Sequence, residues 1–131
     1  MTLEGRKAKA MELHGKGYNC AQSVLLVFDD YTNIDADIAA RIAMGLGGGM
    51  GGQGEVCGAV LGMALVAGLC GDADPKCKPG AYAAVRELTR RFRERNSGCH
   101  LCRDLKGKCR IPCDDLIVGA VEILHNYLEE K

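Results

Sequence analysis

Eight cysteines are the residues of this sequence with the clearest capacity for chemistry. Three of them, Cys20, Cys57 and Cys113, fall where predicted helices begin. A helix N-terminus offers unsatisfied N–H groups and a partial positive charge, and both stabilise a thiolate. The thiolate is the form of cysteine that attacks disulfides and binds metals. Cys102, in a short turn after an arginine-rich segment, is a candidate fourth member, so the residues alone suggest a redox or metal site.

The opposing interpretation is that these cysteines pack as small hydrophobic residues, which free cysteine often does. This interpretation suits Cys70, at the end of an apolar segment. Cys77 follows across a proline-containing loop, and the two could form a local disulfide or none. Cys99-His-Leu-Cys102 is a Cys-x-x-Cys element, compatible with half a zinc site, a dithiol switch or part of a cluster site. We expect His100, between them, to be exposed rather than to ligate a metal.

A glycine-rich loop precedes the most apolar stretch of the chain. Its candidate cofactor-binding residues are Gly47, Gly48, Gly49, Gly51 and Gly52. A glycine loop ahead of a helix lets backbone N–H groups approach an anion or a cofactor closely. The alternative is a tight connection between two helices. The formal dinucleotide-binding spacing within the loop carries little weight, because that motif follows a strand and a helix is expected here.

The elements that would position these residues are all helical. The apolar segment from about Glu55 to Cys70 has the composition of a helix buried on all sides. Asn19 and Gln22 are typical of a capping box that opens the helix carrying Cys20. Further helices are expected over 2–14, 35–46, 81–96 and 114–130. No stretch shows sustained strand alternation. We therefore predict an all-α fold: one compact domain, residues 1–131, built as a bundle of about five helices.

The charge balance and the lengths of the apolar segments restrict the kinds of partner that we expect for this chain. The 17 basic and 17 acidic residues balance, so neither nucleic acid nor an anionic membrane surface is indicated. The arginines of the helix over 81–96 are expected to form a solvated face, partly paired with Glu87 and Glu94. No apolar run reaches the about 20 residues of a membrane-spanning helix, and no signal peptide is apparent. We expect a cytoplasmic protein, in which many cysteines point to metal or redox chemistry.

The sequence resembles a family of redox-active proteins named for a C-GCAxxG-C-C pattern. The resemblance is carried by Gly17–Gln22, Gly47–Gly51, Glu55–Gly62, Arg95–Leu105, and Cys113 with the helix that follows. It implies a redox or metal-binding role for four characteristic cysteines, which are Cys20, Cys57, Cys102 and Cys113. A similar domain occurs in a split-Soret type cytochrome for which an iron–sulfur cluster has been proposed. The resemblance therefore also implies a cysteine-ligated cluster.

Three hypotheses follow. In the first, Cys20, Cys57, Cys102 and Cys113 hold a metal centre for electron transfer, with an iron–sulfur cluster favoured and zinc as the alternative. In the second, no metal is bound and Cys57 is the attacking thiolate of a thiol–disulfide protein. In the third, the glycine loop binds a small ligand.

Some questions stay open at this point. The additional cysteines are Cys70, Cys77, Cys99 and Cys109, and they leave open which thiols of the C-terminal third are ligands. The redox partner is unknown, and no enzymatic reaction is indicated. A homodimer is conceivable through the small residues of the central helix.

Overall fold

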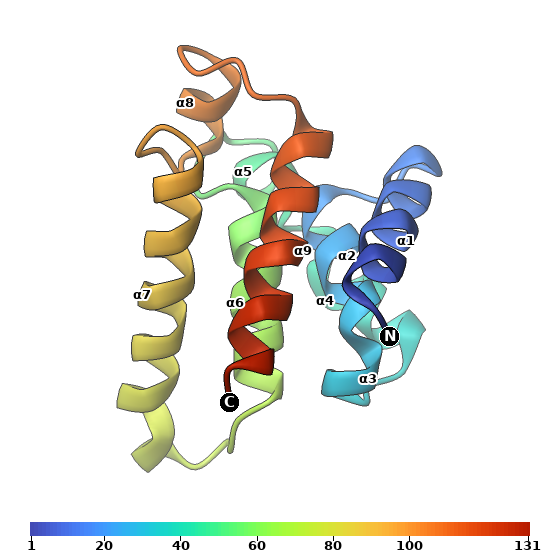
Figure 1. Cartoon of the computed structure of the whole chain (residues 1–131), viewed down its shortest axis with the longest axis vertical. Coiled ribbons are helices and arrows are strands. Elements are labelled where there is room, and N and C mark those ends of the chain that lie inside the picture. Colours follow the sequence, from blue (N-terminus) through green and yellow to red (C-terminus); the bar gives the residue numbers. More distant parts are fainter.

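The computed structural model describes all 131 residues, and the chain folds into helices joined by loops (Figure 1). The longer helices are α1 (Leu3–Gly15), α4 (Ala36–Met44), α6 (Gly58–Leu69), α7 (Lys78–Arg95) and α9 (Cys113–Glu129). One nearly continuous helical run consists of α2 (Cys20–Leu25), the 3₁₀ segment η1 (Leu26–Phe28) and α3 (Asp29–Thr32). The remaining short segments are α5 (Gly47–Met50), η2 (Pro75–Cys77) and α8 (Cys102–Lys106). The predicted all-α fold is confirmed.

The number of helices is higher than the five predicted. The difference lies in short segments such as α3, α5 and α8, which have four or five residues each. A segment of one turn is too short to show the periodicity by which a helix is recognised in a sequence. In addition, α7 begins at Lys78 rather than at the predicted Ala81. Its first turn contains Pro79, which is tolerated there because that N–H group has no partner within the helix.

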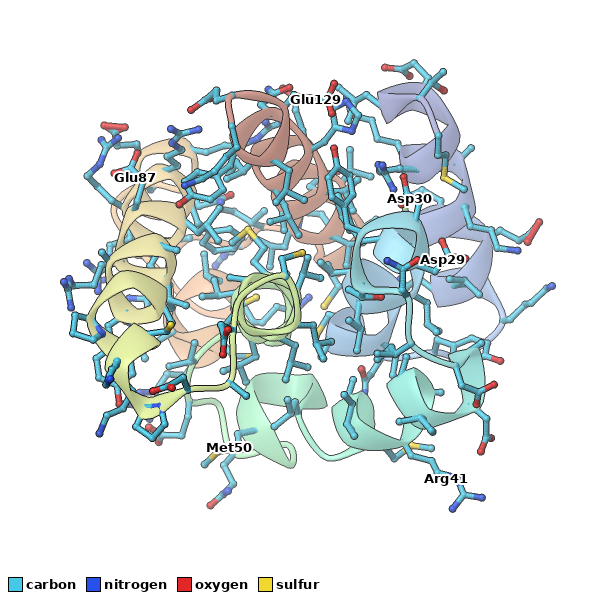
Figure 2. The ribbon with its side chains drawn as sticks, turned by 90° about the horizontal axis from the view of Figure 1, so that it is seen from below. Asp29, Asp30, Arg41, Met50, Glu87 and Glu129 are labelled. Carbon is cyan, nitrogen blue, oxygen red and sulfur yellow. The ribbon has the colours of Figure 1, made fainter.

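Helix α6 forms the centre of the bundle and is seen end-on in Figure 2. It packs against α2, α7 and α9. A Cβ atom on Gly62 would lie only 2.9 Å from the Cβ atom of Val24 in α2, so the small-residue face of α6 is covered within the chain. Buried positions continue as far as Val66, but Leu69 is 37% exposed. The prediction of a helix buried on all sides is therefore wrong for the last turn, which reaches the surface.

The start of α2 is fixed by the predicted capping box. The side chain of Asn19 accepts a hydrogen bond from the Gln22 N–H group (2.8 Å), and the Gln22 side chain accepts one from the Asn19 N–H group (2.9 Å). Both side chains also reach α4, where Asn19 donates to the carbonyl of Met44 and Gln22 to that of Ala40, each at 2.9 Å. These bonds hold the first turn of α2, and Cys20 with it, against α4.

The arginines of α7 are partly paired with carboxylates, as predicted. Arg90 contacts Glu87 and Glu94, and Arg91 contacts Glu87 and Glu130. Such exposed pairs contribute little to stability but leave few unpaired charges on this face. No helix of the chain combines the length and the apolar character that crossing a bilayer requires.

A buried charge organises the region between α1 and α3, and the sequence analysis did not single it out. Arg6 is 1% exposed and holds both carboxylate oxygens of Asp30, at 2.6 and 2.7 Å. It also donates to the carbonyl of Val27 (2.6 Å) and to His125 Nδ1 (3.1 Å), and its guanidinium lies 4.5 Å from the centre of the Phe28 ring. Figure 2 shows Asp30 on this side of the bundle. The hydrogen bond from Arg6 lowers the pKa of Asp30.

Candidate functional site

The starts of α2, α6, α8 and α9 lie at the same end of the bundle, the upper end in Figure 1. Each start carries a cysteine. Cys20, Cys102 and Cys113 are the first residues of α2, α8 and α9, and Cys57 is the N-cap residue of α6. The prediction that Cys20, Cys57 and Cys113 begin helices is confirmed, and Cys102 shares this placement. We call these four residues the four-cysteine site.

The backbone holds Cys57 and Cys102 side by side. The N–H group of Cys57 donates to the carbonyl of His100 at 2.8 Å, and the N–H group of Cys102 donates to the carbonyl of Glu55 at 2.6 Å. Between these two bonds lies an isolated antiparallel bridge, formed by the residues that precede Cys57 and Cys102. Paired segments of this kind lie about 5 Å apart, so residues far apart in the sequence become neighbours.

Two glycines make room for the thiols. A Cβ atom on Gly58 would overlap with Cys20 Sγ, and one on Gly49 would lie 2.7 Å from the Cβ atom of Cys102. Gly49 also has a φ of 73°, in the left-handed region that favours glycine. Any larger residue at these positions would push the cysteine side chains away. The glycine loop and the start of α6 therefore leave space for the cysteine side chains, because their glycines have no side chains of their own.

Each of the four thiols acts electrostatically on at least one of the others. Burial, helped by the charges of Cys20 and Cys102, raises the pKa of Cys57 to about 12. Burial also raises the pKa of Cys102, and the charges of Cys20 and Cys113 act in the same direction. The fold thus brings together four cysteines that are widely separated along the chain.

Burial overturns one expectation, that Cys57 is an attacking thiolate. The start of α6 does act as expected, because the backbone N–H groups of Ala59 and Val60 lower the pKa of Cys57. However, Cys57 is only 3% exposed, and the loss of water around a charged sulfur outweighs their effect. A free Cys57 thiol therefore keeps its proton at neutral pH.

Lys106, in α8, is the cation of the four-cysteine site. Its Nζ atom donates to Cys113 Sγ at 3.0 Å. This hydrogen bond raises the pKa of Lys106, and the charges of Cys102 and Cys57 act in the same direction. Reactive cysteines are typically found beside a cation and at a helix N-terminus, and Cys113 has both. Sequence reasoning missed Lys106, because it lies in a short segment without a periodic pattern.

Comparison with known proteins shows the family to which the chain belongs. Residues 18–127 match the protein family described as "Putative redox-active protein (C_GCAxxG_C_C)". The chain belongs to this family. An uncharacterized protein of Archaeoglobus fulgidus is 29% identical to the chain, over 98% of the chain and 96% of its own length. No solved structure matches the chain. The resemblance stated from the sequence is confirmed, and all four residues of the site lie within the part that matches the C_GCAxxG_C_C family.

The other cysteines of this C_GCAxxG_C_C protein lie outside the four-cysteine site. Cys99 and Cys109 face each other, with their Sγ atoms 3.2 Å apart. The Cys-x-x-Cys element is therefore divided, since Cys99 faces Cys109 while Cys102 belongs to the four-cysteine site. Cys70 and Cys77 are free and exposed near the opposite end of α6, where they line one cavity of about 310 Å³. The interpretation of Cys70 as a buried residue is wrong, because the last turn of α6 reaches the surface.

His100 is a positioning residue of this region. It is half-buried rather than fully exposed, and its carbonyl accepts the hydrogen bond from Cys57. Its Nδ1 atom accepts a hydrogen bond of 3.0 Å from Arg93 Nε. Burial and the charge of Arg93 lower the pKa of His100.

The glycine loop is internally hydrogen-bonded and is tightly packed at some positions only. The N–H group of Gly52 donates to the carbonyl of Gly47, and that of Gly54 donates to the carbonyl of Gly48. A Cβ atom on Gly47 would lie 2.6 Å from the Cβ atom of Asn19. None of the three cavities of the chain is lined by residues 47–54. Close packing thus accounts for part of the glycine content, and cofactor binding by the loop stays a prediction.

The thiols of the site are suitable metal ligands, but their present arrangement does not form a metal site. Thiolates are the ligands that zinc and iron–sulfur clusters prefer. In this conformation, however, no three His, Cys, Asp or Glu side chains are grouped so that they could hold a metal ion. Metal binding would require the thiols to turn toward a common point. Ligation by the four cysteines therefore stays a prediction.

Proposed function

We propose that this member of the redox-active family is an electron-transfer protein whose four-cysteine site binds a metal centre, with an iron–sulfur cluster favoured over zinc. The observation that supports the proposal is the placement of four cysteines, at four helix starts, at one end of the bundle. An iron–sulfur cluster with four cysteine ligands supplies one-electron transfer.

The surroundings of the thiols suit this role. Because burial keeps the proton on Cys57 and Cys102, ligation must release those protons, and metal affinity should rise with pH. Four thiolates in a partly buried site carry much negative charge. Lys106 offsets part of this charge and donates a hydrogen bond to Cys113, a type of contact that raises the reduction potential of a cluster.

Anaerobic purification of the full chain, followed by iron, sulfide and zinc analysis and absorption spectroscopy, tests this proposal. We expect bound iron and sulfide in the unaltered protein and their loss in Cys57→Ser and Cys113→Ser. Cys77 is an exposed thiol near the opposite end of α6, so Cys77→Ser is the matched control and should retain the iron and sulfide. Circular dichroism establishes that each variant is folded. Anaerobic protein with no metal at all would contradict the proposal, and zinc without iron would change the identity of the metal.

The contact between Lys106 and Cys113 favours a second candidate, metal-free thiol–disulfide exchange at the same site. The Cys113 thiolate would attack a disulfide of a partner and release one thiol. Cys102, whose pKa is affected by the charge of Cys113, would then displace the second thiol and leave a Cys102–Cys113 disulfide. This candidate predicts metal-free anaerobic protein, a reversible disulfide between these two residues, and slower alkylation of Cys113 in Lys106→Met.

A further inference from the structure

The contact between Cys99 and Cys109 is the closest approach of two thiols that the structure records, and it lies outside the four-cysteine site. Their Sγ atoms are 3.2 Å apart, in hydrogen-bond contact. A disulfide bond is about 2.05 Å long, so the sulfurs need to move together by only about 1 Å. The two residues are ten positions apart, which makes the contact a product of the fold rather than of local spacing.

The backbone on both sides holds the two thiols in this position. The N–H group of Cys99 donates to the carbonyl of Asn96 at 3.1 Å, and the N–H group of Cys109 donates to the carbonyl of Asp104 at 3.0 Å. The Asn96 side chain is itself buried and donates to the carbonyl of Phe92 at 2.9 Å. The pair is therefore anchored to the end of α7 on one side and to α8 on the other.

The two sulfurs differ in their access to solvent. Cys99 is 8% exposed and also contacts the carbonyl of Ser97 at 3.7 Å, whereas Cys109 is only half-buried. Cys109 is thus the thiol that an oxidant in solution can reach, and Cys99 is placed behind it. The hydrogen bond with Cys99 raises the pKa of Cys109, so oxidation should become faster as the pH rises.

We propose that Cys99 and Cys109 form a redox site of their own, a dithiol that small-molecule disulfides convert to an intramolecular disulfide. The Cys109 thiolate attacks one sulfur of the oxidant RSSR, and RS⁻ leaves and takes up a proton. Cys99 then loses its proton to solvent and attacks the Cys109 sulfur, and the second RS⁻ leaves. The balance is two protein thiols plus RSSR giving one protein disulfide plus two RSH.

The position of this disulfide gives it a structural consequence. The segment between Cys99 and Cys109 contains all of α8, including Cys102 and Lys106. A covalent bond between its ends closes a short loop around α8 and restricts its motion. Oxidation of the pair therefore restricts the motion of Cys102 and of Lys106 beside the four-cysteine site, while leaving the four thiols of that site reduced.

Disulfide mapping of the full chain in a glutathione buffer tests this proposal. Reduced protein is incubated at increasing ratios of oxidised to reduced glutathione, quenched by alkylation, digested and analysed by mass spectrometry. Because the two thiols are already in contact, we expect the Cys99–Cys109 disulfide to form before any other, at an effective concentration above the millimolar value typical of flexibly linked groups. Adding a dithiol reductant should reverse it.

Two variants make the outcome specific. Cys109→Ser should abolish the linked peptide and leave Cys99 free for alkylation, whereas Cys77→Ser should leave the linkage unchanged. A first disulfide between Cys102 and Cys99, or between Cys102 and Cys113, would overturn the proposal, as would free Cys99 and Cys109 in the most oxidising buffer. Metal content measured on the same samples tests the four-cysteine site separately, so that failure of either proposal can be recognised.

Discussion

The two ends of α6 place the same type of residue in opposite surroundings. At the N-terminal end, Cys57 is 3% exposed, its backbone is hydrogen-bonded to His100, and the charges of two other thiols, Cys20 and Cys102, act on it. At the C-terminal end, Cys70 is exposed and its sulfur reaches only the carbonyl of Tyr31, at 4.0 Å. The difference arises from the neighbours, since glycines and a backbone bridge enclose the first end and solvent surrounds the second. Cysteine content alone therefore does not locate the site; placement at a packed helix start does.

The largest difference between the two ends should appear in thiol reactivity. A thiol with a pKa of about 12 has roughly a thousandfold less thiolate at neutral pH than one with the ordinary value of about 8.5. In reduced, metal-free protein we expect Cys57 to be alkylated at least about a thousandfold more slowly than the exposed Cys77. Timed quenching and peptide mapping measure both rates, which should converge in denaturant. Similar rates in the native protein would contradict the contrast between the ends.

The next largest effect concerns Arg6, which lies away from the thiols. Asp30→Asn leaves this buried guanidinium without its counter-charge, and we expect a loss of about 2–3 kcal/mol in the free energy of unfolding. Because Arg6 lowers the pKa of Asp30, the contribution is complete above about pH 4 and is lost as the pH falls through the lowered pKa.

Urea unfolding at neutral and acidic pH measures the effect of Asp30→Asn. In acid, the variant and the unaltered protein should have similar free energies of unfolding. Asp30 of the unaltered protein is then protonated in both the folded and the unfolded state. Asp37→Asn, which breaks the exposed pair with Arg41, is the matched control and should change stability by less than about 1 kcal/mol. Equal losses of stability in the two variants would show that burial of Arg6 does not strengthen the contribution of its ion pair.

A smaller effect, of opposite sign at an interior glycine and at a glycine of the last turn, is expected within α6 itself. Gly62→Ala places a Cβ atom 2.9 Å from Val24 and 3.0 Å from the carbonyl oxygen of Ala21, and should cost about 1–3 kcal/mol. Gly68→Ala meets nothing within 4 Å and should stabilise the protein by about 0.5–1 kcal/mol, because alanine favours the helix. Urea unfolding of both variants gives the comparison, and a loss of stability in Gly68→Ala would refute it.

The smallest effect is expected for an ion pair next to the four-cysteine site. Arg103 contacts Glu55 at 2.9 Å, but both side chains are about half exposed. Glu55→Gln keeps the backbone carbonyl that accepts the hydrogen bond from Cys102 and removes only the charge. We expect a change below about 0.5 kcal/mol in the free energy of unfolding, and an unchanged rate of Cys57 alkylation. A faster rate would mean that this charge pair, and not the backbone bridge, closes the site.

The features that could be predicted from the sequence are those that depend on local chemistry. The capping box of Asn19 and Gln22 follows from residue types three positions apart, and it places Cys20 at a helix start. The same reasoning correctly placed Cys57 and Cys113. In each case the signal lies within one or two turns of helix, where periodicity and capping rules apply.

The features that could not be predicted depend on contacts between distant residues. The Cys99-His-Leu-Cys102 spacing suggested a pair, but Cys99 meets Cys109 because the chain turns back after α8. Nothing in the residues around Arg6 distinguishes it from the other charged residues of α1, and its counter-charge is Asp30 in α3. No rule based on neighbouring residues indicates such partners, and only the packed structure identifies them.

The position of Cys113 at the first residue of α9 also bears on biosynthesis. This last helix packs against α1, α6 and α7, so the bundle is incomplete until it has docked. A ribosome must therefore release the chain as far as α9 before the four cysteines can come together. Until then Cys20, Cys57 and Cys102 are without the helix that carries Cys113, so a metal that needs all four thiols can bind only after α9 has docked.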